Sequence, residues 1–408
     1  MMKNCLIAQS GGPTVAINAS LSGVIRGAMA SNQIDRIYGG RNGIQGILEE
    51  RLLLLNPIFE NHEENLVKLE HTPAMYLGSC RYKMKDYKED STDYDKLCAL
   101  FEKYEIGFFF YIGGNDSMDT VAKLSVYTRE QGLDVKVIGI PKTIDNDLTM
   151  IDHTPGFGSA AKFISTAMLE MAHDTYIYNI DTVLIVEIMG RNAGWLTAAA
   201  SLARNEYSEA PHLIYLPEVA FDKEAFVAKL RELLKKKHHI LVAVSEGIKD
   251  ADGNYLSAQG GKVDQFGHVM LSGTGEVLKG IVQEEIGCKV RSVELNVLQR
   301  AAAHMASAAD IAESIRLGEN GVRLANEGRT GVMSTLIRVS DEPYEVRYDE
   351  GDIAQIANQE KKIPREWITQ DGSDVTAEME RYLCPLIQGE HLASYENGMP
   401  QFLFAPEE

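Results

Sequence analysis

The sequence IGFFFYIGGNDS at residues 106–117 and the sequence VKVIGIPKTIDND at residues 135–147 share one layout. Each begins with a short apolar run, typical of a buried strand, and ends in a polar loop. The intervening residues 118–132 have helical length and mix polar with apolar side chains. A strand, a crossover and a second strand predict parallel pairing. Polar loops at the carboxyl ends of such strands form a ligand crevice, so these two loops are the first candidates for a functional site.

The same alternation of strand-like and helical stretches extends over most of the chain. Further apolar runs that indicate strands lie at residues 4–8, 34–38, 182–188, 240–244 and 293–298. A chain of 408 residues is too long for one ordinary core. The pattern therefore predicts an α/β protein with two Rossmann-like three-layer domains, mainly parallel sheets and an active site in the cleft between the domains.

No Gly/Ser-rich or Pro-rich linker is present, so we expect segments that cross between the domains instead of a flexible tether. The first domain is expected to comprise residues 1–157 together with about 300–345, and the second residues 158–299. Residues 346–408 are richer in Glu, Pro and aromatic side chains and show weaker periodicity. We expect them to form a C-terminal arm that packs on the body, or a lid.

The formal net charge of −19 argues against nucleic acid or an anionic membrane as a partner, because both require a basic face. No run of about 18 apolar residues and no signal-peptide pattern is present, so a soluble, cytoplasmic protein is expected. The five cysteines are scattered without a Cys-x-x-Cys pair, which argues against disulfides and a zinc site. A phosphorylated substrate would need a local cationic pocket inside this acidic exterior.

Glycine loops that carry cationic side chains are the candidates for such a pocket. Gly11 and Gly12 follow the first apolar run and precede a helical stretch, and helix N-termini bind anions through unpaired amides. Arg81 and Lys83 follow another glycine, and Arg191 lies in a glycine-flanked turn suited to bidentate phosphate binding. Taken singly, the glycine pair also suits an ordinary tight turn, and Arg81 and Lys83 also suit a solvated surface.

Asp145 and Asp147 lie in the second of the two loops quoted first. Such residues also form capping turns. In the functional interpretation, one carboxylate is a general base and the other organises magnesium, with their roles set by their surroundings. Calcium is disfavoured because the loop lacks the ligand spacing of an EF-hand.

Residues 156–161, Gly-Phe-Gly-Ser-Ala-Ala, match a shortened dinucleotide fingerprint, which would indicate an oxidoreductase. A true fingerprint follows a strand directly, whereas Pro155 interrupts the residues before this one. We therefore expect these glycines to lead into a helix at residues 159–173. No Gly-x-x-x-x-Gly-Lys-[Ser/Thr] stretch occurs, which excludes P-loop nucleotide chemistry.

In their order along the chain, these loops resemble the phosphofructokinase family, and specifically its pyrophosphate-dependent members. The resemblance extends from residue 4 to about residue 300. The segments that carry it are Gly11-Gly12, residues 78–81, 113–117, 141–147, 189–191 and 245–247, and Gln299-Arg300. It implies reversible transfer of a phosphoryl group from pyrophosphate to the 1-hydroxyl of fructose 6-phosphate, giving fructose 1,6-bisphosphate and phosphate, in glycolysis and gluconeogenesis.

The resemblance also implies roles for individual residues. The catalytic residues would be the base Asp145 together with Thr143, Asp147 and Arg191. Donor binding, in the first domain, would fall to Gly12, Arg81, Gly114, Asp116, Ser117 and Lys142. The sugar phosphate, held mainly by the second domain, would contact Thr143, Asp145, Met189, Gly190, Arg191, Glu246, Arg291 and Arg300. Asn115 and Asp147 would hold Mg²⁺, the one cofactor expected.

Two positions make the donor prediction specific. Members that use ATP typically have glycine where Asp116 and Lys142 stand, which leaves room for the α-phosphate of the nucleotide. Two like charges about 4 Å apart cost on the order of 4 kcal/mol at an effective dielectric near 20, which is roughly a thousandfold in binding. Lys142 can meanwhile neutralise the leaving phosphate of pyrophosphate. Both positions therefore predict pyrophosphate as the donor.

Three positions depart from the family pattern. Asn115 replaces a common aspartate, Val297 replaces a His or Tyr, and Thr182 replaces an arginine that reaches a neighbouring subunit. They leave open the same chemistry on sedoheptulose 7-phosphate or another sugar phosphate, and a non-catalytic regulatory subunit. The expected partners are small-molecule substrates and further copies of the chain, as a homodimer or homotetramer.

Overall fold

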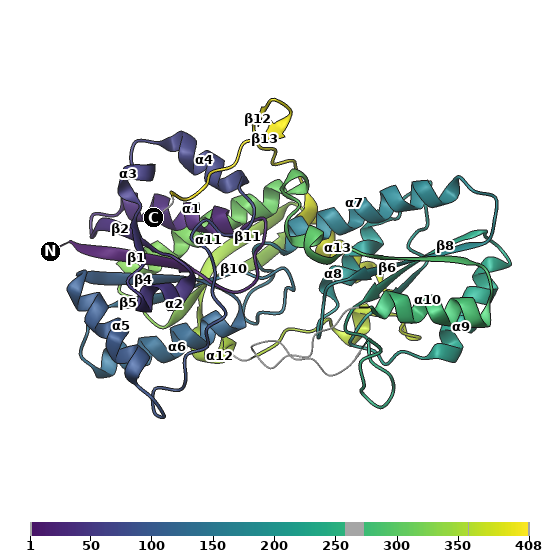
Figure 1. The fold of residues 1–408 in the computed structure, drawn as a ribbon, viewed down its shortest axis with the longest axis horizontal. Coiled ribbons are helices and arrows are strands. Elements are labelled where there is room, and N and C mark those ends of the chain that lie inside the picture. The colour runs from purple at the N-terminus through teal and green to yellow at the C-terminus, as the bar shows by residue number, and fades with distance from the viewer. Residues whose placement is uncertain (1, 258–272, 358, 407–408) are drawn as a thin grey trace.

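The computed structural model describes residues 2–257, 273–357 and 359–406. Figure 1 shows an elongated molecule with two lobes side by side, each built around its own sheet. Within the described part of the chain, no helix combines the length and the apolar character needed to cross a membrane.

Seven strands form the sheet of the first lobe: β1 (Lys3–Gln9), β2 (Ile34–Gly40), β3 (Leu52–Leu54), β4 (Ile106–Gly113), β5 (Lys136–Pro141), β10 (Val332–Asp341) and β11 (Tyr344–Asp352). Their order across the sheet is β11-β10-β5-β4-β1-β2-β3. The five central strands pair in parallel, and the edge strands β3 and β11 pair antiparallel. The carboxyl ends of β1, β4 and β5 consequently lie next to one another at one edge.

Helices cover both faces of this sheet, as the nearly continuous apolar runs of its strands require. Along β4, Phe108 and Phe110 pack into one core, and Phe109 and Tyr111 pack into the other. The first face is covered by α1 (Ile17–Ala30), α3 (Asn56–Phe59), α4 (Glu63–His71) and α11 (Ala308–Asn326). The second is covered by α2 (Gly43–Leu48), α5 (Thr92–Lys103), α6 (Asn115–Glu130) and α12 (Ile353–Ile356).

Four parallel strands form the sheet of the second lobe: β6 (Thr182–Ile188), β7 (Leu213–Tyr215), β8 (His239–Ser245) and β9 (Lys289–Glu294), in the order β7-β8-β6-β9. One face packs against α7 (Phe157–Tyr176), α8 (Trp195–Ala198) and the 3-10 helix η1 (Ala199–Ala203). The other face packs against α9 (Lys223–Leu234) and α10 (Thr274–Glu285). This lobe is therefore also a three-layer α/β unit.

The predicted architecture of two three-layer α/β units with mainly parallel sheets is confirmed. The glycines at residues 156–161 lead into α7, and Gly156 has a left-handed φ of 99° at its start. The predicted strand at residues 293–298 is wrong, because β9 ends at Glu294 and a 3-10 helix, η2 (Asn296–Arg300), follows. The apolar side chains of Val297 and Leu298 misled the prediction, since they are exposed.

The C-terminal segment connects the two lobes. Strand β11 continues the first sheet to Asp352, beyond residue 346, where the arm was expected to begin. The chain then crosses to the second lobe, where it forms η4 (Arg365–Trp367), α13 (Ala377–Leu383) and η5 (Cys384–Ile387). The remaining short elements are η3 (Ala303–Met305), β12 (Tyr395–Glu396) and β13 (Met399–Pro400). The boundaries of the two domains stay a prediction.

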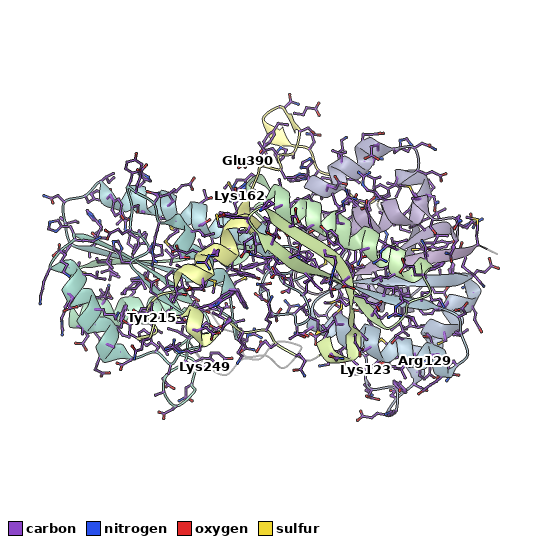
Figure 2. All side chains as sticks on the ribbon, turned by 180° about the vertical axis from the view of Figure 1, so that it is seen from behind. Lys123, Arg129, Lys162, Tyr215, Lys249 and Glu390 are labelled. Carbon is purple, nitrogen blue, oxygen red and sulfur yellow. The ribbon has the colours of Figure 1, made fainter. Side chains whose placement is uncertain are left out.

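Two contacts fix the course of the last residues. Lys162 of α7 bonds the carboxylate of Glu390 at 2.9 Å, and Figure 2 shows the two side chains together. The backbone nitrogen of Leu403 donates to Thr72 Oγ1 at 2.8 Å, beside the end of α4. The tail thus returns from the second lobe to the first.

Candidate active site

Lys142 joins the three loops at the carboxyl edge of the first sheet. Its backbone nitrogen donates to the carbonyl oxygen of Gly113 at 2.9 Å. Its ammonium donates to the carbonyl oxygen of Gly12 at 2.7 Å. A Cβ on Gly11 would lie 3.2 Å from Nζ, at a φ of +83°, so glycine at this position leaves room for the lysine. Lys142 is 3 % exposed, and burial lowers its pKa to about 8, while Asp145 and Asp147 oppose the shift.

The two predicted carboxylates follow Lys142 in a tight turn. Thr143 Oγ1 accepts a hydrogen bond from the backbone nitrogen of Asp145 at 3.1 Å, which shapes the turn. Burial raises the pKa of the Asp145 carboxyl, against the lowering influence of Lys142 and of Arg191 and Arg300. Burial and the charge of Asp145 raise the pKa of Asp147 to about 7. Buried carboxyls whose pKa values are raised, lying beside cations, are typical of functional sites, so this turn is a candidate catalytic element.

The second lobe contributes the loops after β6 and β8. Glu246 Oε1 accepts from the backbone nitrogen of Gly190 at 3.3 Å. The loop after β8 and the loop after β6 can lie this close because residue 247 is glycine. A Cβ at that position would lie 1.9 Å from the carbonyl oxygen of Arg191. Burial raises the pKa of Glu246 to about 7, with the charge of Asp145 acting in the same direction and Arg191 against it. Asp145 and Arg191 therefore lie near each other although they belong to different lobes.

Two polar atoms of predicted site residues are buried without a hydrogen-bond partner. They are Arg191 Nε and Asn115 Oδ1. Asn115 otherwise donates from Nδ2 to the carbonyl oxygen of Gln359 at 2.9 Å. Lys361, two residues after Gln359, donates its backbone N–H to the carbonyl oxygen of Asp147 at 2.7 Å, so Asn115 and Asp147 border the same segment. An unpaired amide oxygen and a carboxylate that border one segment are compatible with Mg²⁺, which prefers oxygen ligands and few protein carboxylates.

The described residues do not by themselves form a closed metal cage. Among residues 2–257, 273–357 and 359–406, no group of three His, Cys, Asp or Glu side chains is arranged to hold a metal ion. A magnesium ion here would depend on oxygen atoms of the phosphoryl donor and on water for its remaining ligands.

The remaining residues predicted to bind the donor lie at the same edge. Gly114 precedes α6, and Ser117 is buried in its first turn. Asp116 is half exposed and lies 3.8 Å from the ammonium of Lys83. Arg81 is exposed on the same loop as Lys83, two residues before it.

Arg300 and Arg291, both expected at the sugar phosphate, lie in different places. Arg300 lies against the donor loop, since a Cβ on Gly12 would be 3.5 Å from its Nη1. Gln299 beside it accepts from the backbone nitrogen of Met189 at 3.3 Å, so this stretch borders both groups of loops. Arg291 is exposed on edge strand β9, where it lines a small hollow with Thr182 and Tyr178. The structure therefore does not bring Arg291 into the group around Asp145 within one chain.

No local pattern predicted that residues 359–363 would lie at the site. They follow α12 in the segment predicted only as an arm or lid, and no motif marks them. The charge of Glu360 raises the pKa of both Asp145 and Asp147. Only the three-dimensional structure places this segment beside the site.

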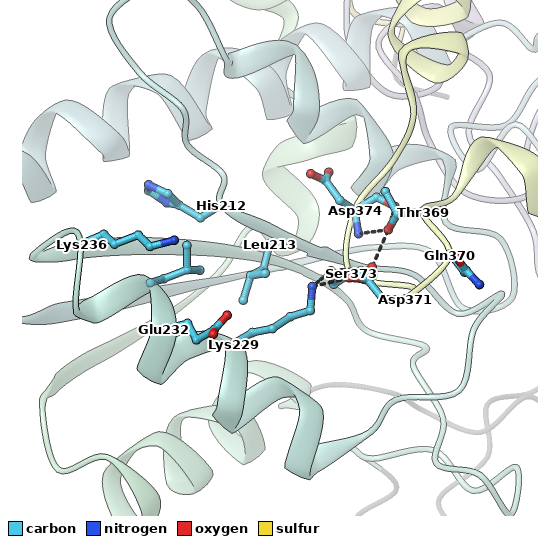
Figure 3. Close-up of a pocket in the computed structure, with 11 residues that line it drawn as sticks. His212, Leu213, Lys229, Glu232, Lys236, Thr369, Gln370, Asp371, Ser373 and Asp374 are labelled. Atoms are coloured by element: carbon cyan, nitrogen blue, oxygen red, sulfur yellow. Dashed lines mark hydrogen bonds and ion pairs between the residues drawn. The ribbon is translucent and has the colours of Figure 1, made fainter.

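A separate cavity of about 570 Å³ lies in the second lobe and is shown in Figure 3. It is lined by residues of α9 and of the chain around residues 369–374. The ammonium of Lys229 is bonded there to Asp371 and, at 2.7 Å, to Ser373 Oγ. None of the predicted site residues lines this cavity.

Comparison with known proteins identifies the family. The family profile described as "Phosphofructokinase" matches residues 4–325. The chain belongs to the phosphofructokinase family. A relative from Halomonas elongata, named pyrophosphate–fructose 6-phosphate 1-phosphotransferase, is 41% identical over 401 residues, which cover 98% of this chain and 95% of the relative. A relative of the same name from Methylococcus capsulatus is 40% identical over 404 residues, with the same coverage of 98% and 95%.

A solved structure of the family has the same fold as this phosphofructokinase. The crystal structure titled pyrophosphate-dependent phosphofructokinase from Nitrosospira multiformis superimposes with a TM-score of 0.89 at 38% sequence identity. The match covers 100% of this chain and 99% of the other. The two-lobed α/β architecture is therefore that of the family.

Proposed function

We propose that this phosphofructokinase reversibly transfers a phosphoryl group from pyrophosphate to the 1-hydroxyl of fructose 6-phosphate, giving fructose 1,6-bisphosphate and phosphate. The observation that carries the proposal is the buried ammonium of Lys142 on the carbonyl oxygen of Gly12. It fills the space above the glycine pair with a positive charge. A diphosphate gains from that charge, and a bulkier nucleotide loses the room that glycine at position 142 would leave.

In the proposed reaction, the oxygen of the sugar 1-hydroxyl attacks the terminal phosphorus of pyrophosphate, and Asp145 accepts the hydroxyl proton. The bond from that phosphorus to the bridging oxygen breaks, and the leaving phosphate carries away the bonding electrons. Lys142 and Arg300 border the donor loop and offset the charge of the leaving group. Positioning and charge neutralisation of this kind supply most of the catalysis in phosphoryl transfer.

The sugar phosphate would be held by the loops of the second lobe. Arg191 has a buried donor without a partner, Nε, and its guanidinium suits a phosphate. Glu246 would accept hydrogen bonds from sugar hydroxyls, while Met189 and Gly190 offer backbone atoms. Asn115 and Asp147 would hold Mg²⁺, which would draw charge from the donor oxygens during transfer.

Three further features belong to the proposal. Fructose 6-phosphate and pyrophosphate are metabolites of the cell interior, so the enzyme would work in the cytosol.

Arg291 is exposed away from Asp145, and a role for it at a sugar phosphate would require a second copy of the chain, as a homodimer or homotetramer. Val297 is exposed where the family commonly binds sugar phosphate, so sedoheptulose 7-phosphate is a second acceptor to test.

Initial rates with Mg²⁺ and fructose 6-phosphate test the proposal, with pyrophosphate or ATP supplied in parallel and fructose 1,6-bisphosphate read through aldolase. We expect turnover with pyrophosphate and at least a hundredfold less with ATP. Turnover with ATP alone would overturn the donor assignment. Parallel reactions with sedoheptulose 7-phosphate, read as phosphate release, establish the acceptor.

A further inference from the structure

Residues 359–363 run between the turn of Asp145 and the loop of Arg191, where the chain crosses from the first lobe to the second after α12 (Figure 1). Lys361 is the residue that contacts both. Its backbone N–H donates to the carbonyl oxygen of Asp147 at 2.7 Å. Its backbone carbonyl accepts from the indole nitrogen of Trp195 at 3.0 Å.

The Lys361 ammonium binds the far side of the catalytic turn. It donates to Asn146 Oδ1 at 3.2 Å, to the carbonyl oxygen of Ile151 at 3.3 Å and to that of Asp152 at 2.6 Å. An ammonium group has three N–H donors, and these three neutral oxygens match that number. A desolvated lysine is costly unless its donors are satisfied, so this arrangement favours a single conformation of the turn.

The turn needs such support because Asn146 has a left-handed φ of 54°. This conformation costs energy for any residue with a side chain, although Asn tolerates it better than most. The buried Asn146 amide is held on both sides: Oδ1 accepts from the backbone nitrogen of Thr154 at 3.1 Å, and Nδ2 donates to Tyr382 Oη at 2.9 Å. Lys361 supplies the third of these contacts.

On the side of the second lobe, the segment is bound to the loop that carries Arg191. Glu218 Oε1 accepts from the backbone nitrogen of Gly194 at 2.9 Å and from that of Ile363 at 3.2 Å. The Lys361 ammonium also lies 5.2 Å from the ring centroid of Trp195, the first residue of α8. One short segment thus connects the turn of the first lobe with the loop of the second.

We propose that Lys361 is a positioning residue for phosphoryl transfer, which fixes Asp145 relative to Arg191 across the two lobes. The inference rests on the proposed function, because it takes Asp145 as the base and Arg191 as a sugar-phosphate ligand. A shift of about 1 Å between reacting groups can cost on the order of a hundredfold in rate. Lys361 itself touches neither substrate in this assignment.

The test is a double-mutant cycle of Lys361→Met with Asp145→Asn, with Lys136→Met as the control, a lysine at the start of β5 that pairs with Asp134 at 2.6 Å. We expect Lys361→Met to lower kcat about a hundredfold with the KM for fructose 6-phosphate changed less than about threefold. In the Asp145→Asn background, the same change should lower kcat by less than about threefold, because the base it positions is already absent. Lys136→Met should match wild type.

A kcat for Lys361→Met within twofold of wild type would overturn the inference. An equal loss in both backgrounds would also overturn it, because a general loss of folded enzyme lowers all rates alike. If Lys361→Met does not fold, Trp195→Phe removes the indole N–H that bonds the Lys361 carbonyl, together with part of the ring beside the ammonium, and should lower kcat at least threefold. A wild-type kcat for Trp195→Phe would then overturn the inference. If the wild-type enzyme shows no turnover with any of these donors and acceptors, the proposed function itself is overturned.

Discussion

The ammonium of Lys142 lies 2.7 Å from the carbonyl oxygen of Gly12, so a buried cation on β5's loop closes the glycine turn that follows β1. Burial costs this ammonium part of its basicity, and its pKa of about 8 leaves it mostly charged at neutral pH. A charge kept out of water acts strongly on nearby phosphates because the local dielectric is low. The lysine is thus both an occupant of space and a fixed positive charge.

Replacing Lys142 by Met is expected to lower kcat/KM with pyrophosphate roughly 100- to 1000-fold, the typical effect of losing one preorganised charge-stabilising donor. Initial rates of bisphosphate formation measure the effect. The control is Lys136→Met, at the start of the same strand, where the lysine instead pairs with Asp134 at 2.6 Å. A Lys142 variant that retains more than a tenth of the wild-type kcat/KM would contradict the assigned role.

The double change Asp116→Gly and Lys142→Gly is expected to create measurable turnover with ATP. It removes a half-exposed carboxylate and a buried cation at the two positions where glycine typically leaves room for a nucleotide. Rates with ATP and with pyrophosphate, measured on the same preparation, give the ratio. If that ratio stays at the wild-type value, donor choice is set elsewhere in the site.

Asp145→Asn is expected to lower kcat about 100- to 10,000-fold, because the amide cannot accept the hydroxyl proton. The side chains have nearly the same shape, so the KM for fructose 6-phosphate should change little. Steady-state kinetics with pyrophosphate separate the two constants. A loss of less than tenfold would indicate that another group takes the proton.

The contrast between Asp145 and Lys361 shows which parts of the site the sequence could predict. Asp145 follows a strand within a few residues, and strand, loop and spacing are local features that a sequence displays. Lys361 reaches the same turn from 216 residues further on, through a segment without periodicity or motif, so only tertiary packing reveals it. The prediction of a strand over Val297 and Leu298 was wrong for a related reason. A short apolar run does not by itself distinguish a buried strand from an exposed 3-10 turn.

His153 is expected to make stability fall as the solution becomes alkaline. It is buried between Asp152, at 2.8 Å, and Glu313, at 2.6 Å, and these carboxylates overcome the opposing effect of burial and raise its pKa from 6.5 to about 9. The unfolded chain releases this proton earlier. The stabilisation is therefore complete below pH 6.5 and lost as the pH rises through 9, with an upper limit on the order of 3 kcal/mol.

Urea unfolding from pH 6 to pH 10 measures this dependence. His153→Gln should be less stable than wild type at pH 6 and should show a flatter curve between pH 6.5 and 9. His62→Gln, at an exposed histidine 3.0 Å from Glu64, should keep the wild-type curve. Parallel curves for wild type and His153→Gln would show that the histidine does not carry this linkage.

The docking of the C-terminal tail is expected to weaken in acid, because it includes a stacked histidine pair. The rings of His71, at the end of α4, and His391 lie 3.9 Å apart at 21°, and burial lowers the pKa of both, that of His391 to about 4. The docked tail therefore resists protons that the released tail would bind below pH 6.5. The loss approaches completion near pH 4 and amounts to about 1–2 kcal/mol for His391 after allowance for solvent screening.

Hydrogen exchange of residues 388–406 at pH 7 and pH 5, corrected for the intrinsic rate, measures this release. Wild type should exchange faster at pH 5, whereas His391→Phe should retain a stacked ring without its titration and show a smaller difference. Glu390, which pairs with Lys162, is unchanged in both proteins, so its own titration cancels in the comparison. If the two proteins show the same difference in exchange between pH 7 and pH 5, the titration of His391 does not cause the release. The effect would then belong to Glu390 or to another group.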